Sequence, residues 1–216
     1  MSETATLLTA RHFRYVAEHT TRDDAFLARL KRAAREAGLP SIWIAPEQAS
    51  LMQILLRLAR ARRVVEVGTL AGYSAIAMAR ALPAGGRVHT IELNPVHADF
   101  AERWIARSDV AGRIRVHRGA GAEVLPRFGS GSADAAFLDA DKPSYPLYLR
   151  ECLRIVRPSG LIMVDNAFGF GRLLDPRSRD REVRALRAFN ERMANAHGLH
   201  SVIAPLGDGL WVGVKR

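Results

Sequence analysis

Residues 63–74 read "RVVEVGTLAGYS", a valine-rich stretch that contains one acid, Glu66, reaches a glycine, and leads through a second glycine into a helical pattern. The same alternation continues along the chain. β-rich runs at 87–93, 113–118, 133–139 and 160–166 alternate with helical segments over 72–82, 95–108, 121–128 and 145–156. Strands that alternate with helices imply right-handed crossovers and a parallel sheet with helices on both faces.

The two ends of the chain depart from this alternation. Residues 3–38 have helical spacing up to a stop at Gly38-Leu39-Pro40, and a further helix begins near Pro46. After a charged helix over 179–196, the segment "HSVIAPLGDGLWVGVKR" (200–216) contains two β-rich stretches around a Gly-Asp-Gly turn, which predicts an antiparallel hairpin. We therefore expect an α/β domain over residues 1–216, with a mostly parallel seven-stranded sheet and a helical N-terminal extension over 1–45.

Composition places the chain among ordinary globular proteins. It has 216 residues, 48% of them apolar and 25% charged, which suits one domain with a real core. There is no apolar run of the roughly 18–20 residues that span a bilayer, and the start lacks the pattern of a signal peptide. The single cysteine, Cys152, rules out an internal disulfide and fits a reducing compartment. We expect a cytoplasmic protein without a membrane partner.

The net charge of +10 raises the question of a nucleic-acid partner. Of the 32 basic residues, three are lysines (Lys31, Lys142 and Lys215), and the arginines are scattered along the chain. The densest basic stretch, 172–187, is interrupted by acids and is typical of a loop and a solvated helix face. Charge alone supports no conclusion about nucleic acid, which we expect to be an unlikely partner that is not excluded.

The turn "EVGTLAGYS" (66–74) joins the first strand to its helix, where open α/β sheets bind nucleotides. Glu92 ends the next strand and can accept hydrogen bonds from both ribose hydroxyls. A nicotinamide cofactor would fit these features equally well. However, a dinucleotide site needs G-x-G-x-x-G, and here the second and third glycine positions hold Leu70 and Tyr73. The loop therefore favours a nucleoside without phosphates, of which S-adenosylmethionine (SAM) is the common example.

Oxygen ligands follow two other strands of the predicted sheet. Asp139 ends "AAFLD", and Asp165 and Asn166 end "LIMVDN". The carboxyl ends of parallel strands open onto one crevice, so these groups should lie close to Glu92 and the glycine loop. Asp and Asn also cap turns, and the Asp-Asn pair by itself favours that role. Together with Asp139, the set predicts a site for Mg²⁺ or Ca²⁺.

The segments "EVGTLAGYS", "IELNP", "FLDADK" and "VDN" stand in the order and spacing of the metal-dependent catechol and caffeoyl-CoA O-methyltransferase family, which this chain resembles from about Pro46 to Gly171 and again in the final "GDGL". The resemblance implies a Rossmann-like class I methyltransferase fold, a homodimer, and N-terminal helices that border the active site. It also implies a divalent cation, Mg²⁺ first with Mn²⁺ or Ca²⁺ as alternatives, on Asp139, Asp165 and Asn166. The SAM site that it implies comprises Glu66, Gly68, Thr69, Ser74, Glu92, Ala120, Asp139 and Asp141, with Ala120 at the adenine edge.

The resemblance makes Lys142 the catalytic base beside Asp139. A lysine can lose its proton where an arginine effectively cannot, so a lysine at this place in an arginine-rich chain fits that role. We therefore expect a SAM- and metal-dependent O-methyltransferase acting on a vicinal dihydroxy aromatic molecule. The alternatives are a methyltransferase for hydroxylated uridine in tRNA and a nucleoside-binding Rossmann-like protein without activity. Trp43 and "AFGFGRLLD" (167–175) depart from the family pattern and leave the acceptor open.

Overall fold

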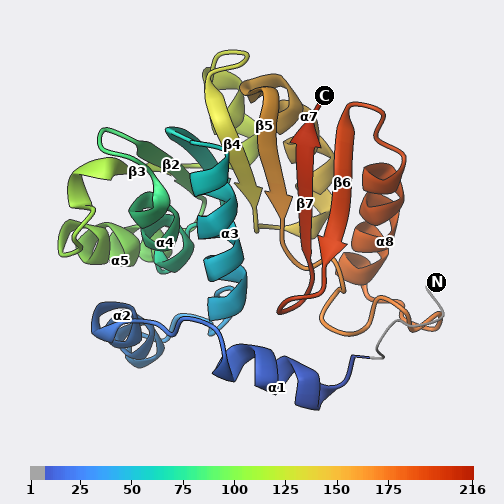
Figure 1. Cartoon of the computed structure of the whole chain (residues 1–216), viewed down its shortest axis with the longest axis horizontal. Helices are drawn as coiled ribbons and strands as arrows, with labels where there is room; N and C mark the ends of the chain where they lie inside the picture. Colours follow the sequence, from blue (N-terminus) through green and yellow to red (C-terminus); the bar gives the residue numbers. More distant parts are fainter. Residues whose placement is uncertain (1–7) are drawn as a thin grey trace.

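A seven-stranded sheet with the order β3-β2-β1-β4-β5-β7-β6 runs through the centre of the computed structural model, which describes residues 8–216 (Figure 1). Each neighbouring pair from β3 across to β5 is parallel, and β7 pairs antiparallel with both β5 and β6. This confirms the predicted mostly parallel sheet with a C-terminal hairpin. The strands are β1 (Arg63–Val67), β2 (Arg87–Glu92), β3 (Ile114–Arg118), β4 (Ala133–Leu138), β5 (Val156–Val164), β6 (Leu199–Ala204) and β7 (Leu210–Lys215).

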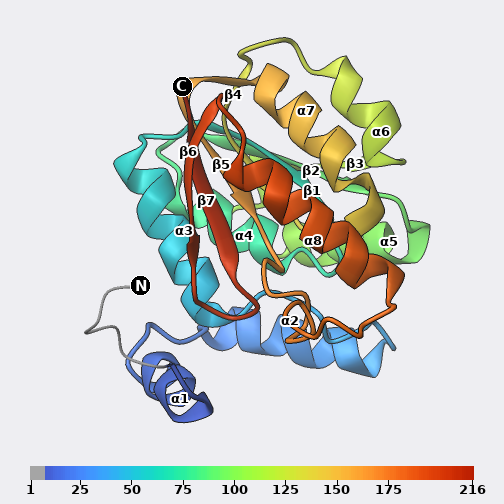
Figure 2. The same ribbon diagram turned by 90° about the vertical axis from the view of Figure 1, so that its right-hand side faces the viewer.

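Helices cover both faces of the sheet, as Figures 1 and 2 show. On one face lie α3 (Pro46–Leu58), α4 (Tyr73–Ala81) and α5 (Pro95–Ala106), and α2 (Ala25–Glu36) packs against α4. On the other face lie α6 (Gly121–Val124), α7 (Tyr145–Ile155) and α8 (Arg181–Ala194). Short 3₁₀ turns occupy Ala111–Arg113, Leu125–Arg127 and Lys142–Ser144.

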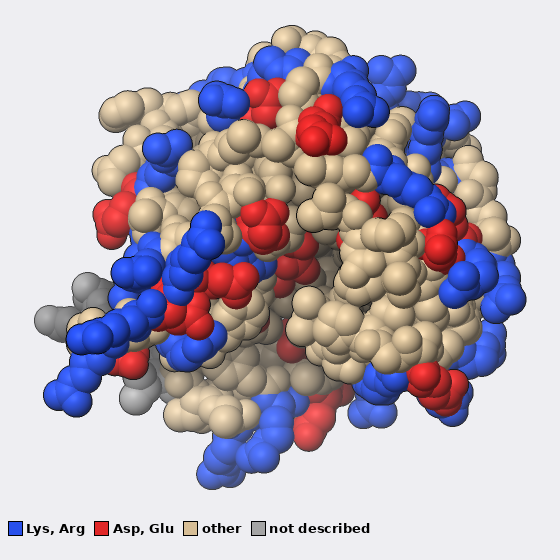
Figure 3. All heavy atoms as spheres, turned by 180° about the vertical axis from the view of Figure 1, so that it is seen from behind, with Lys and Arg blue, Asp and Glu red and all other residues tan. Residues whose placement is uncertain are grey.

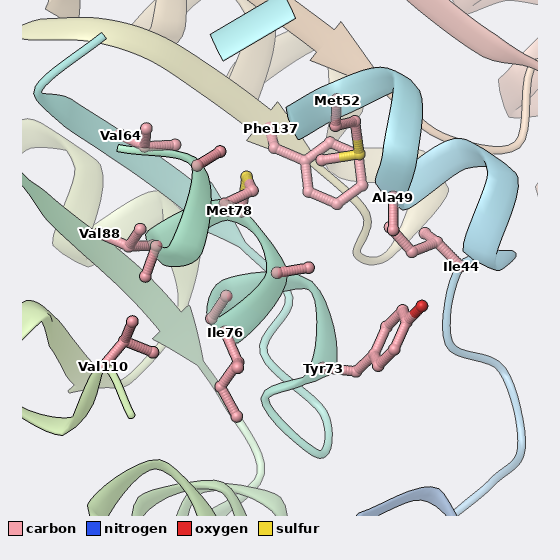
Figure 4. Close-up of a cluster of buried hydrophobic side chains, with 14 of the residues drawn as sticks. Ile44, Ala49, Met52, Val64, Tyr73, Ile76, Met78, Val88, Val110 and Phe137 are labelled. Atoms are coloured by element: carbon pink, nitrogen blue, oxygen red, sulfur yellow. The ribbon is translucent and has the colours of Figure 1, made fainter. Parts of the chain in front are cut away.

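Alternate residues of each strand divide between two buried clusters. Val64 of β1 and Phe137 of β4 face the α3–α4 side, whereas Val65 and Leu138 face the α7–α8 side. Figure 4 shows the first cluster, in which the Phe137 ring lies near Met52 of α3. Because side chains point to opposite faces with a period of two, strands that are buried on both faces appear in the sequence as continuous apolar runs.

The N-terminal extension is not one continuous helix. The helical pattern predicted over 3–38 begins outside the described residues and, within them, forms α1 (Ala10–Glu18) and α2 (Ala25–Glu36). Asp24 is the N-cap of α2: its backbone is extended, and its carboxylate accepts a hydrogen bond from the Leu27 amide at 2.9 Å. A capping aspartate starts a helix and cannot continue an earlier one, so the pattern is interrupted over 19–24. Among residues 8–216, no helix has both the length and the apolarity to cross a membrane.

The loops after β1 and β4 approach each other closely at Gly68. This residue has φ +100°, and a Cβ added to it would lie 1.8 Å from the carbonyl oxygen of Asp139. Only a glycine therefore allows the two strand ends to stay adjacent, and this contact places the glycine loop beside the first acid of "DADK".

We expect Gly68→Ala to prevent stable folding or to lower stability severely, because strain at positive φ, about 1–3 kcal/mol, is added to a clash with backbone. Gly38→Ala is the matched control: Gly38 has φ +77° with nothing within 4 Å of an added Cβ. It should cost only the conformational strain. Urea unfolding of both variants measures the difference, and equal losses would contradict the close approach at Gly68.

Candidate active site

A cavity of about 480 Å³ opens at the carboxyl ends of the parallel strands. Its wall comes from the loops that follow β1 to β5 and from residues 42–44 between α2 and α3. Figure 3 shows acidic side chains inside a hollow of the molecule, while Lys and Arg are spread over that face and are not gathered in one patch. The cavity brings together most of the predicted site residues: Gly68, Thr69, Ser74, Glu92, Asp139, Asp141, Lys142 and Asn166.

Three predicted site residues adjoin this wall without being part of it. Ala120 lies between Gly119 and Gly121, which do line the cavity. Asp165 directly precedes Asn166, and Glu66 accepts a hydrogen bond from the Ser74 hydroxyl at 2.5 Å. Ala120, Asp165 and Glu66 therefore lie directly behind or beside residues that a ligand in the cavity would contact.

Glu92 organises the glycine loop. One of its carboxylate oxygens accepts hydrogen bonds from the backbone amides of Thr69 at 3.1 Å and Leu70 at 2.8 Å. The other accepts from the Asn94 amide at 2.9 Å. Thus the residue that the sequence marked as a ribose ligand also fixes the loop that would surround the nucleoside.

Glu66 is a buried carboxyl group in the same region. It points from β1 to the α4 side of the sheet, and burial raises its pKa to about 8. Its Oε2 atom has no hydrogen-bond partner among the described residues, so one polar atom stands next to the cavity wall unsatisfied.

Lys142 connects the ends of β4 and β5. Its ammonium donates hydrogen bonds to Asn166 Oδ1 at 2.5 Å and to the Tyr145 hydroxyl at 2.8 Å, and it lies 3.2 Å from Asp139 Oδ1. The side chain is buried, with a residue exposure of 5%. One cationic group is thus held between the oxygen atoms of two predicted metal ligands.

Asp165, the third predicted ligand, is buried beside this group. Gln48 of α3 donates a hydrogen bond to its Oδ1 atom at 2.6 Å. Burial first, and then the negative charge of Asp139, raise the pKa of Asp165 to about 7. Two carboxyl groups therefore lie near each other with incomplete neutralisation, and a further cation would relieve this repulsion.

The described residues include no group of three or more His, Cys, Asp or Glu side chains that could hold a metal ion. The predicted set contains two carboxylates and one amide oxygen, which is a hard-oxygen set of the kind that Mg²⁺ uses together with water. The Lys142 ammonium contacts Asp139 Oδ1 at 3.2 Å and Asn166 Oδ1 at 2.5 Å, so both oxygens already face one positive charge. The residues present therefore fit a divalent ion.

Sequence reasoning missed several residues that support the site. Asp208, in the hairpin turn between β6 and β7, accepts hydrogen bonds on Oδ2 from Asn166 Nδ2 at 3.2 Å and from the Phe170 amide at 2.8 Å. The Tyr148 hydroxyl donates to Asp141 Oδ1 at 2.7 Å. The acid in "GDGL" was a visible signal for Asp208, whereas Gln48 showed only as a polar residue on the buried face of a helix.

The outer wall of the cavity is apolar and aromatic. Ile42 and Trp43 line it from the N-terminal extension, and Phe170 lines it from the loop after β5. The Arg35 guanidinium lies 5.0 Å from the centre of the Trp43 ring, a cation–π distance. The two segments that departed from the family pattern in the sequence thus both line this cavity.

Comparisons with known proteins agree with this geometry. A family model described as "O-methyltransferase" matches residues 17–216. A catechol O-methyltransferase of Niastella koreensis is 39% identical over 197 residues, which cover 90% of this chain and 86% of that protein.

Two solved structures are similar along almost the whole chain. An O-methyltransferase from Bacillus cereus in complex with SAH has a TM-score of 0.86 and 30% identity, covering 95% of this chain and 97% of the other. The O-methyltransferase TomG from Streptomyces achromogenes, in complex with SAM, has a TM-score of 0.83 and 33% identity, covering 95% and 96%. With the glycine loop, Glu92 and the "DADK" segment around one cavity, these matches show that the chain is an enzyme of the O-methyltransferase family.

Proposed function

We propose that this enzyme is a SAM-dependent and divalent-metal-dependent O-methyltransferase that acts on a vicinal dihydroxy aromatic molecule. The observation that carries the proposal is the position of Lys142, whose ammonium bridges Asp139 and Asn166 in the wall of the same cavity that holds the glycine loop and Glu92. This arrangement supports a nucleoside site and a cation site that lie next to each other and to a lysine side chain.

SAM as the methyl donor is supported by the loop chemistry and by two relatives that were solved with SAM or SAH. Leu70 and Tyr73 line the cavity where a pyrophosphate would need glycines. We assign the ribose hydroxyls to Glu92 and the adenine edge to Ala120, with the rest of the SAM molecule along Glu66, Gly68, Thr69, Ser74, Asp139 and Asp141. When bound, SAM supplies a methyl group that is already activated by its positive sulfur.

We assign the cation, Mg²⁺ first, to Asp139, Asp165 and Asn166. When bound there, a divalent ion would lower the pKa of an acceptor hydroxyl and would orient two neighbouring oxygens of one ring. The name of the Niastella koreensis relative, a catechol O-methyltransferase, supports a diol acceptor. Trp43 and Phe170 offer apolar surface for an aromatic ring at the cavity wall.

Lys142 is the base in this proposal. The ammonium first gives one proton to solvent, and the resulting amine takes the proton of the acceptor hydroxyl as the oxygen forms a bond to the methyl carbon and the bond from that carbon to sulfur breaks. For this, Nζ must leave the oxygen atoms of Asp139 and Asn166, which it occupies in the structure, and turn toward the acceptor. Asp139 and Asn166 would hold a divalent ion through the oxygens that Lys142 now contacts, which would leave the lysine free for the acceptor.

Two further features remain proposals. Residues 1–45 act as an extension of a single domain that borders the acceptor site, which the positions of Ile42 and Trp43 in the cavity wall support. A homodimer in the cytoplasm stays a prediction from the sequence.

Methyl transfer to catechol measured with and without Mg²⁺ tests this function. We expect turnover with Mg²⁺ or Mn²⁺, loss of turnover in excess EDTA, and recovery when metal is restored. Asp165→Ala should lose turnover but keep SAM binding in calorimetry, because the glycine loop and Glu92 are intact. Full activity in excess EDTA would refute the metal dependence, and a lack of SAM binding would refute the donor.

Substitutions of Lys142 separate proton transfer from charge. Lys142→Met should lower kcat by roughly 10²–10⁴, the usual contribution of general-base catalysis, with little change in SAM affinity. Part of the rate should return as the pH rises, because hydroxide can then take the proton.

Lys142→Arg keeps the positive charge but cannot accept a proton at accessible pH. It should therefore be as slow as Lys142→Met in single-turnover assays at neutral pH. Near-native turnover of Lys142→Arg would make Lys142 an electrostatic anchor and not the base.

A further inference from the structure

We infer that Gln48 and Asp208, which lie outside the motifs of the strand ends, are positioning residues that aim the oxygen atoms of Asp165 and Asn166 at the cation site. This inference rests on the proposed metal site. The two residues come from opposite ends of the chain, Gln48 from the first turn of α3 and Asp208 from the turn between β6 and β7. Each contacts one of two consecutive ligands.

The Gln48 side chain has a fixed orientation. Its Oε1 atom accepts a hydrogen bond from the Ala45 amide at 3.1 Å, and a backbone amide can only donate. Nε2 is therefore the atom that faces Asp165, to whose Oδ1 it donates at 2.6 Å. Gln48 is 2% exposed, so water does not readily replace this bond. The contact engages Oδ1 and holds the carboxylate plane in one orientation.

Asp208 fixes the amide of Asn166 in the same way. An ionised carboxylate only accepts and a lysine ammonium only donates, so Nδ2 must face Asp208 and Oδ1 must face Lys142. A flipped amide would present hydrogens to a cation and could not bind it. Asn166 also has φ +64°, a left-handed conformation that asparagine tolerates better than most residues.

The same aspartate also holds the backbone around Asn166. Its Oδ2 accepts from the Phe170 amide at 2.8 Å, and its carbonyl oxygen accepts from the Phe168 amide at 2.8 Å. Next to it, the Gly209 carbonyl accepts from the Ala167 amide at 2.9 Å. The loop after β5 is thus attached to the hairpin turn along residues 166–170.

The two positioning residues meet at Gly207. A Cβ added to Gly207 would lie 2.2 Å from Gln48 Oε1, so the hairpin turn packs directly against the glutamine amide. Helix α3 and the C-terminal hairpin therefore pack together and support the two ligands as one unit. Hydrogen-bond partners of metal ligands contribute about 10–100-fold to metal affinity or activity in other proteins.

The experiment measures Mn²⁺ affinity by the electron paramagnetic resonance signal of free Mn²⁺, in the presence of saturating SAH. The variants are Gln48→Met, which keeps the volume but not the amide, Asp208→Ala, and Asp208→Asn, which keeps an acceptor oxygen. We expect the first two to bind Mn²⁺ at least about tenfold more weakly, within the range for such partners, and Asp208→Asn to recover part of the loss. SAH affinity from calorimetry should stay within about twofold of the native value, since neither residue contacts the glycine loop.

Matched controls lie on the same elements or have the same chemistry. Gln53→Met removes an amide of α3 that donates to the Ala77 carbonyl at 2.8 Å, away from the ligands. Asp134→Ala removes an aspartate that accepts from the Arg62 and Arg63 amides at 2.8 and 2.9 Å, at the start of β4. Both controls should bind Mn²⁺ like the native enzyme.

The inference is overturned if Gln48→Met and Asp208→Ala bind Mn²⁺ as tightly as their controls. It is also overturned if their Mn²⁺ and SAH affinities fall together with the melting temperature, because this would show a general structural role. Asp165→Ala distinguishes a failure of the proposed metal site from a failure of the positioning role. Suppose that the native enzyme binds Mn²⁺ and Asp165→Ala does not. A native Mn²⁺ affinity in Gln48→Met then contradicts the positioning role but leaves the proposed metal site in place. If the native enzyme binds SAH but no Mn²⁺, the proposed metal site and this inference both fail.

Discussion

The buried ammonium of Lys142 requires oxygen partners, and the carboxyl ends of β4 and β5 are arranged around this requirement. A charge removed from water costs several kcal/mol unless it is paired and hydrogen-bonded. Here Asp139 supplies the opposite charge, while Asn166 and Tyr145 supply neutral oxygens. Because Gly68 packs against the carbonyl of Asp139, the same strand end also sets the position of the cofactor loop. The ion pair between Lys142 and Asp139 therefore lies between the glycine loop after β1 and Asn166 at the end of β5.

Much of the fold follows from the alternation of β-rich and helical segments. The strands of the central sheet are buried on both faces, so "AAFL" appears as a continuous apolar run, and "RVVEV" is valine-rich apart from Arg63 and the buried Glu66. The Gly-Asp-Gly turn predicted the C-terminal hairpin, which is present. The break over 19–24 was missed although this stretch contains no apolar residue, and the cap formed by Asp24 shows where α2 starts.

The candidate site was predictable where its residues directly follow strands. Asp139, Asn166 and Glu92 stand at strand ends, and parallel strands bring such ends together whatever the details of packing. Gln48 and Asp208 could not be found in this way, because their contacts depend on how α3 and the hairpin pack over the end of β5. From the sequence, Glu92 was predicted only as a ribose ligand. Its three backbone hydrogen bonds show a second role, in holding the glycine loop.

The central claim is that Lys142 and a divalent cation share one set of oxygens and that the cation frees the lysine for the acceptor. A crystal structure with SAH, Mn²⁺ and a catechol tests it most directly, since anomalous scattering locates the metal. The account predicts Mn²⁺ on the oxygens of Asp139, Asp165 and Asn166, with Lys142 Nζ moved from Asn166 to an acceptor oxygen. A structure with SAH and catechol bound, no anomalous peak at these residues and Lys142 still on Asn166 would contradict it.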